Sequence, residues 1–160
     1  MKSQRIPPGV IILTLSVAIV LTLVPLPLNL DLLRPYWVAL VLIYWCLEAQ
    51  DQISLGIAFS IGLLLDLLTG SLLGLHALSL VILVYLITRF RARLRFFPTW
   101  QLALSIFALL LNDRIILLWI ISLRGDPVPS LSFWLPPIAG TLLWPVVFLL
   151  LDRVRAVMRQ

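Results

Sequence analysis

The sequence has very few of the residues from which proteins build metal sites and disulfides. It contains one cysteine, Cys46, and one histidine, His76, in 160 residues. A single cysteine cannot form an internal disulfide, and one cysteine with one histidine falls short of the ligand set of a zinc site. We therefore expect neither a metal site nor a bound cofactor.

Charge is also scarce. Only 12% of the residues are charged, whereas 62% are hydrophobic, and the mean hydropathy is +1.12. Soluble globular domains are about 45–50% apolar and about 25% charged, so this chain has more apolar surface than a water-soluble fold could bury. This excess excludes an ordinary soluble enzyme. The net charge of +5 is better explained by membrane topology than by binding of nucleic acid, which we do not expect as a partner.

Long uncharged stretches predict an all-α, polytopic membrane protein, a bundle of six transmembrane helices in one integral membrane domain. A helix needs roughly 20 apolar residues to cross a bilayer. The predicted spans cover residues 9–26, 32–49, 53–69, 72–88, 100–122 and 132–151. The second apolar stretch, Tyr36 to Leu47, is short at about 18 Å for 1.5 Å per residue, so it spans only with its flanking residues or in a thinned bilayer. We expect Pro35 at the first position of this helix.

The positively charged residues predict the orientation of the chain. Lys and Arg gather in cytoplasmic loops, and six spans with a cytoplasmic N-terminus place nine of the twelve positive residues on the cytoplasmic side. Both termini are therefore expected in the cytoplasm. Four of these residues form a cytoplasmic basic patch, namely Arg89, Arg91, Arg93 and Arg95. The patch either anchors the chain to anionic membrane lipids or contacts a cytoplasmic partner.

Small residues recur at every fourth position in and after the third predicted span. The series is Ser54, Ala58, Gly62, Asp66, Gly70 and Gly74. Its first four members share one slowly drifting helix face, and small residues let helices approach closely in lipid. A carboxylate costs on the order of 2.5–3.5 kcal/mol at the centre of a span, so Asp66 should be paired or hydrated. The stripe predicts close packing between helices.

Three polar residues, Asn112, Asp113 and Arg114, lie near the middle of the fifth predicted span. Neighbouring helical residues point in different directions, so Asp113 and Arg114 are poorly placed to satisfy each other, and we expect at least one to have a partner on another helix. This intramembrane polar cluster is a clamp for helix register, a contact with a partner protein, or a path for protons or substrate. His76 and Cys46 are expected to be packing residues.

The sequence offers no catalytic motif. Ser60, Asp66 and His76 could suggest a hydrolytic triad, but Ser60 and Asp66 are six residues apart and face different sides of a helix. The serine also lacks the first glycine of a nucleophile elbow. An enzyme that acts on lipid-linked precursors should show two acidic or histidine residues near one interface. Glu48 and Asp51 are the only such cluster, and they look like a helix break. No catalytic residue is predicted.

Residues 34–78 resemble the rod shape-determining protein family MreD. The matching elements are Arg34-Pro35-Tyr36-Trp37, Leu42-Ile43-Tyr44-Trp45, the segment GLLLDLLTG at 62–70 and LGLHAL at 73–78. The resemblance implies a non-enzymatic component of the bacterial inner membrane that belongs to the cell-elongation complex. Such proteins bind MreC and work with MreB filaments, RodA and a class B penicillin-binding protein in peptidoglycan synthesis. The resemblance also implies a fold similar to the S components of vitamin transporters.

On this resemblance we expect one set of residues either to order the bundle or to receive a partner helix: Arg34, Trp37, Tyr44, Trp45, Gly62, Asp66, Gly70 and Gly74. A homodimer within a larger complex stays open. The alternative function is the substrate-binding membrane subunit of a vitamin-type (ECF) transporter. That function requires a pocket that reaches from the outer face to the polar cluster at 112–114.

Overall fold

The computed structural model describes residues 6–25, 27 and 34–158, and these residues are helical apart from short connections. The helices are α1 (Pro8–Leu23), α2 (Trp37–Glu48), η2 (Gln50–Gln52), α3 (Leu55–Thr69), α4 (Leu75–Leu94), α5 (Thr99–Leu123), η3 (Leu131–Trp134) and α6 (Leu135–Val157). The described part of the chain contains no β-strand. The predicted all-α class is therefore confirmed.

Prolines and a cap account for several helix ends. Pro8 occupies the first turn of α1, where a missing N–H group has no helical partner to lose. The helix ends just before Pro25, because the residue before a proline is disfavoured in the helical conformation. Ser54 caps α3 by accepting a hydrogen bond from the N–H of Ile57 at 3.3 Å.

Two predicted helix boundaries were wrong. The second helix begins at Trp37, not at Pro35, because the N–H of Trp37 bonds to the carbonyl of Pro35 in a turn before the helix. The fourth helix does not end at residue 88. It continues through the arginine run to Leu94, since arginine is a good helix former and the helix-breaking proline comes later, at position 98.

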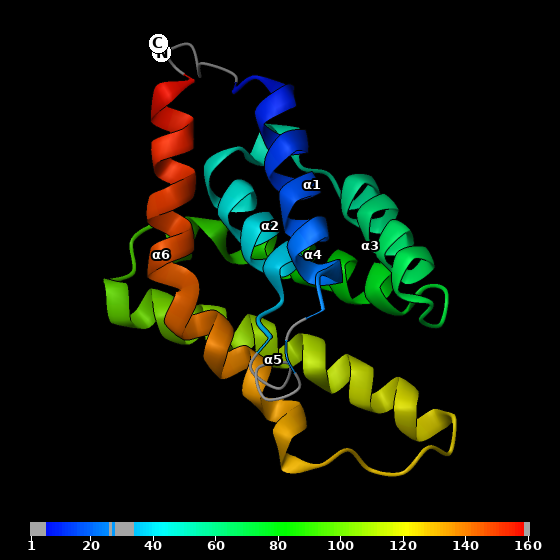
Figure 1. Ribbon diagram of the computed structural model, residues 1–160. Helices are drawn as coiled ribbons and strands as arrows, with labels where there is room; N and C mark the ends of the chain where they lie inside the picture. Colours follow the sequence, from blue (N-terminus) through cyan, green and yellow to red (C-terminus); the bar gives the residue numbers. More distant parts are fainter. Residues whose placement is uncertain (1–5, 26, 28–33, 159–160) are drawn as a thin grey trace.

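Helix α2 lies at the centre of the bundle (Figure 1). It contacts α1, α4 and α6, and ten of its twelve residues are buried. A helix that is apolar on all sides is typical of such a central position. The hydrophobic core of the molecule therefore forms around α2.

Helices α5 and α6 shape the lower half of the molecule in Figure 1, where α5 runs across the bundle and α6 changes direction along its length. Pro145 lies inside α6 and lacks the N–H group that would continue the helical hydrogen bonds, which accounts for the bend. The first turn of α1 and the last turn of α6 lie at the same end of the bundle. The turn between α3 and α4 and the start of α6 lie away from that end.

Three segments of the structure are long and apolar enough to cross a membrane: Leu75–Leu94, Thr99–Leu123 and Leu131–Val157. Helices α1, α2 and α3 are apolar but shorter, with 16, 12 and 15 residues. At 1.5 Å per residue each of them covers less than the roughly 30 Å of a bilayer core. The expected crossing of the membrane by all six helices thus stays a prediction.

Candidate functional site

The carboxylate of Asp66 caps the first turn of α4. Its Oδ2 accepts a hydrogen bond from the N–H of Gly74 at 2.8 Å, and its Oδ1 accepts one from the N–H of His76 at 2.9 Å. The hydroxyl of Ser71 donates to Oδ1 at 2.7 Å. Asp66 is only 1% exposed. Because the start of a helix carries unsatisfied N–H groups and a partial positive charge, this buried carboxylate lies where an anion is stabilised.

Glycines let α3 and α4 come together around this carboxylate. A Cβ atom on Gly62 would lie 2.3 Å from the Cα of Ala77, so the two backbones touch at this point. Gly70 ends α3 with a φ of +65°, and Gly74 precedes α4 with a φ of +97°. Glycine adopts these left-handed angles at little cost. The small residues of the predicted stripe thus face α4 at Gly62 and form the turn at Gly70 and Gly74.

The surroundings of His76 differ from those we expected. Its Nδ1 lies 2.8 Å from Oδ1 of Asp66 and 3.2 Å from Oγ of Ser71, and its ring stands edge-on to Tyr36 with the centroids 6.0 Å apart. The prediction of an apolar packing role was wrong because the turn folds the histidine back onto Asp66.

A serine, a histidine and a carboxylate meet at this turn, but both oxygens contact the same ring nitrogen of His76. In a nucleophilic triad, the serine and the carboxylate use opposite ring nitrogens. The geometry of Asp66, Ser71 and His76 therefore stabilises the turn and does not match that of an activated nucleophile.

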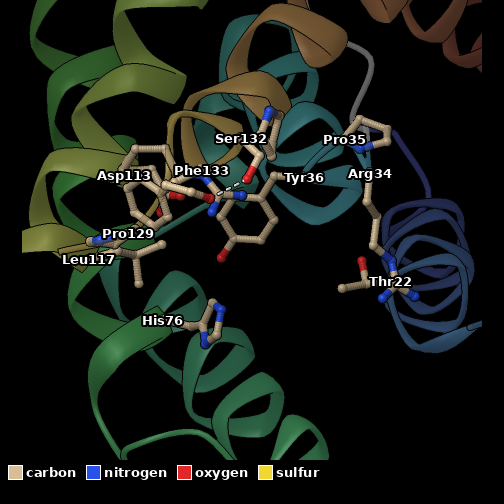
Figure 2. Close-up of a pocket in the computed structure, with 13 residues that line it drawn as sticks. Thr22, Arg34, Pro35, Tyr36, His76, Asp113, Leu117, Pro129, Ser132 and Phe133 are labelled. Atoms are coloured by element: carbon tan, nitrogen blue, oxygen red, sulfur yellow. Dashed lines mark hydrogen bonds between the residues drawn. The ribbon is translucent and has the colours of Figure 1, made fainter. Parts of the chain in front are cut away.

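A cavity of about 490 Å³ lies beside this turn, with His76 and, from the last turn of α1, Thr22 in its wall (Figure 2). Its walls come from the end of α1, the residues before α2, the start of α4, the middle of α5 and the segment around η3. The lining residues are Thr22, Arg34, Pro35, Tyr36, His76, Asp113, Arg114, Leu117, Pro129, Ser130, Ser132, Phe133 and Pro136. The fold thus gathers polar side chains from five separate parts of the sequence.

The three residues of the predicted intramembrane cluster have different surroundings. Asp113 is buried and accepts a hydrogen bond from the hydroxyl of Ser79 on α4. Arg114 lines the cavity, and its guanidinium carbon lies 5.1 Å from the centroid of the Phe133 ring. Nδ2 of Asn112 is buried and has no hydrogen-bond partner among the described residues. Successive helical residues diverge by about 100°, so Asp113 reaches α4 while Arg114 faces the cavity.

The aromatic residues of α2 lie inside the bundle. Tyr44 and Trp45 are fully buried, whereas Trp37 is partly buried against the same core. Nε1 of Trp45 donates to Oγ1 of Thr14 on α1 at 2.9 Å, and the hydroxyl of Tyr44 donates to Oδ1 of Asp152 on α6 at 3.4 Å. These side chains therefore connect α2 to the helices on either side of it.

Two of the selected arginines donate to carbonyl groups at helix ends. Nη2 of Arg34 donates to the carbonyl of Val24, which follows α1. Nε and Nη2 of Arg91 donate to the carbonyl of Leu47 in the last turn of α2, at 2.9 and 2.7 Å. The other members of the predicted basic patch are exposed, and these are Arg89, Arg93 and Arg95. One arginine of the patch thus also holds α4 against α2.

Sequence reasoning did not select four residues that meet the predicted ones: Tyr36, Ser71, Ser79 and Phe133. Each of them makes its contact across a turn or between helices. No local spacing reports such contacts. Of these four residues, only Tyr36 could have been selected from the sequence, because it belongs to the Arg34–Trp37 element on which the family resemblance rests.

Comparisons with known proteins point to one family. A family model described as rod shape-determining protein MreD matches residues 3–154. The rod shape-determining protein MreD of Haemophilus influenzae is 37% identical over 142 residues, which cover 87% of this chain and 86% of that protein. No solved structure matches the chain. The expected similarity to transporter S components therefore stays a prediction.

Proposed function

The chain belongs to the MreD family of rod shape-determining proteins, and from this premise we propose that it is a non-enzymatic scaffold of the cell-elongation complex in the bacterial inner membrane. In this role it binds MreC and helps to couple MreB filaments to peptidoglycan synthesis by RodA and a class B penicillin-binding protein. The family supports a role in cell shape, and the partners are part of the proposal.

The proposal is supported by the surface of the bundle. Many large apolar side chains of α1 and α3 face outward, including Ile12 and Phe59, which are 64% and 50% exposed. Such surfaces suit lipid or the transmembrane helix of another protein. A chain built in this way acts through its helix faces and its short connections.

The single observation that favours MreC as a direct partner is a groove of about 780 Å³ between α1 and α3. Ile12 and Ser16 line it from α1, and Ile57, Ile61 and Leu64 line it from α3. Most of the lining residues are apolar, although Asp51 and Gln52 also line the groove, and the small side chain of Ser16 permits a helix to approach closely. We place the single transmembrane helix of MreC in this groove.

A bulky side chain in the groove tests this placement. In cells that produce both proteins, Ile57→Trp should lower the amount of MreC that co-purifies with the chain about fivefold or more, because the indole fills the groove. Leu67→Trp is the matched control, since Leu67 lies on the same helix but does not line the groove. Equal recovery of MreC with both variants, at wild-type expression, would exclude the groove as its docking site.

The same variants also test the role in cell shape. In a rod-shaped bacterium whose own MreD is depleted, wild-type chain and Leu67→Trp should restore the rod shape, and Ile57→Trp should leave rounded cells. If depletion instead causes a vitamin requirement without rounding, the scaffold function is wrong and a transporter function takes its place.

The residues selected from the sequence have a separate role in this proposal. Arg34, Trp37, Tyr44, Trp45, Gly62, Asp66, Gly70 and Gly74 order the bundle. Support comes from the burial of Tyr44, Trp45 and Asp66 and from the close approach at Gly62. Their substitution should weaken binding of MreC through loss of folded bundle and not through loss of a contact.

The proposed orientation places both termini and the basic patch in the cytoplasm. The first turn of α1 and the last turn of α6 lie at one end of the bundle, which supports a common side for the two termini. Arg89, Arg93 and Arg95 are exposed and suit the anionic inner leaflet or MreB.

A further inference from the structure

The cavity beside the α3–α4 turn has no part in the scaffold function proposed above. It is separate from the groove between α1 and α3 and shares no lining residue with it. Its volume of about 490 Å³ falls within the roughly 300–1,000 Å³ of small-molecule pockets. The chemistry of its walls therefore indicates what it would bind.

The acidic groups in and behind the cavity wall already have donors. The carboxylate of Asp113 accepts a hydrogen bond from the hydroxyl of Ser79. The carboxylate of Asp66 accepts hydrogen bonds from the N–H groups of Gly74 and His76. Neither carboxylate therefore depends on a ligand for its stabilisation.

The guanidinium of Arg114 differs from these two carboxylates, because it is not satisfied in the same way. Among the residues that the structure describes, no carboxylate lies within ion-pair distance of it. Its guanidinium packs over the face of the Phe133 ring, and the neighbouring carboxylate of Asp113, which also lines the cavity, attracts it electrostatically. A partly buried cation inside a membrane protein is costly unless an anion or water compensates it. Asp113 offsets the positive charge of Arg114 only from a distance, without an ion-pair contact, so the guanidinium can still pair with an anion in the cavity.

The hydroxyl of Tyr36 adds a directional group. It is buried and has no hydrogen-bond partner in the described part of the chain. Figure 2 shows it pointing from the residues before α2 into the space between Leu117 and His76. Most buried hydroxyl groups are hydrogen-bonded, so this donor lacks the partner that such a group normally has, and a small shift of its ring would let it donate to a ligand in the cavity.

Apolar residues form much of the remaining wall, including Leu117, Pro129, Phe133 and Pro136. We propose that the cavity binds an anionic ligand, a phosphate or carboxylate group on a small apolar body. Arg114 is its ion-pair partner and Tyr36 its hydrogen-bond donor. Such a group can come from a small solute or from the headgroup of an anionic lipid.

Binding to the purified full-length protein tests this assignment. The chain is placed in nanodiscs of zwitterionic phosphatidylcholine and titrated calorimetrically with phenyl phosphate, with benzyl alcohol as the uncharged control. We expect saturable binding of one phenyl phosphate per chain and none of benzyl alcohol. In a second arm, nanodiscs that contain phosphatidylglycerol are examined by native mass spectrometry for retained lipid.

Three variants locate the binding. Arg114→Gln should weaken binding at least about tenfold, and Tyr36→Phe about threefold to tenfold, as expected for hydrogen bonds to a charged group. Arg124→Gln is the matched control, because Arg124 is exposed just beyond the end of α5 and does not line the cavity. Its affinity should equal that of wild type. Should Arg114→Gln not fold, Arg114→Lys tests the same site, with a smaller expected loss because the charge is kept.

The possible outcomes distinguish a soluble ligand from a lipid headgroup, and both of these from the absence of a binding site. Binding of phenyl phosphate that depends on Arg114 supports a solute. Retention of phosphatidylglycerol that depends on Arg114, without binding of phenyl phosphate, supports a lipid headgroup. The proposal is overturned if wild-type protein binds neither, or if Arg124→Gln weakens binding as much as Arg114→Gln. Either result leaves the scaffold function untouched, since that function is tested by MreC and cell shape.

Discussion

Replacement of Asp66 by asparagine removes the charge that caps α4. The asparagine side chain would keep an oxygen for the donors at the Oδ1 position, but its NH₂ group cannot accept from the N–H of Gly74, which now lies 2.8 Å from Oδ2. One hydrogen bond to a charged group contributes about 1.5–3 kcal/mol, and a carboxylate at a helix N-terminus about 0.3–1 kcal/mol more. We therefore expect Asp66→Asn to lower the free energy of unfolding by about 2–4 kcal/mol.

A variant that removes only part of the cap provides a smaller destabilisation with which that of Asp66→Asn can be compared. His76→Ala loses the hydrogen bond between Nδ1 and Asp66 but keeps the one from the backbone N–H. The expected cost is about 1 kcal/mol. Asp126→Asn is the control, because Asp126 pairs with Arg124 at the surface, where their closest atoms are 3.4 Å apart and both side chains are about half exposed. It should cost less than about 1 kcal/mol.

The assay is reversible unfolding of the purified proteins in mixed detergent micelles, followed by circular dichroism. The expected order of destabilisation is Asp66→Asn, then His76→Ala, then Asp126→Asn. If Asp66→Asn costs no more than Asp126→Asn, the carboxylate does not cap α4 in the way that the geometry indicates. The proposed role of Asp66 as one of the residues that order the bundle would then be wrong.

Two further predictions use the same unfolding assay. Gly62→Ala should cost about 1–3 kcal/mol because its Cβ would meet the α4 backbone. Gly56→Ala, with only the hydroxyl of Ser54 nearby at 3.7 Å, should be neutral or stabilising. Equal costs would contradict the close approach. Arg155→Gln and Glu48→Gln should show a coupling energy of about 0.5–3 kcal/mol in a double-mutant cycle, because their ion pair joins α6 to α2. Purely additive effects would show that this pair does not hold the two helices together.

Much of the fold could be predicted from the sequence. Among the residues that the structure describes, six α-helices occur where the apolar stretches predicted them, because a long uncharged segment has few alternatives to a helix in lipid. The errors lie at the ends. The arginine-rich segment at the end of α4 shows the reason for these errors. Its charged composition is typical of a loop, yet the helix continues through it to Leu94. Helix propensity and contacts with α2 prevail there over hydropathy.

The candidate site could be predicted only in part. The cost of burying charge in a membrane indicated that Asp66 should be paired or hydrated and that at least one of Asp113 and Arg114 needed a partner on another helix. It did not indicate which ones. The partners of Asp66 are eleven or fewer positions away, but across a turn with two left-handed glycines, and Phe133 is nineteen positions from Arg114. The periodicity of the sequence indicates which face of a helix a residue occupies, but it does not indicate which residues of other segments pack against that face.

The amino-acid sequence alone determined that this chain is an apolar helical protein and indicated its family, because hydropathy and short motifs are properties of local sequence. Only the tertiary structure decided that Asp66 caps α4, that Tyr44 and Trp45 are interior, and that Tyr36 and Arg114 face one cavity. The physical reason is that these relations depend on how helices cross, and crossing is set by the packing of side chains from distant segments.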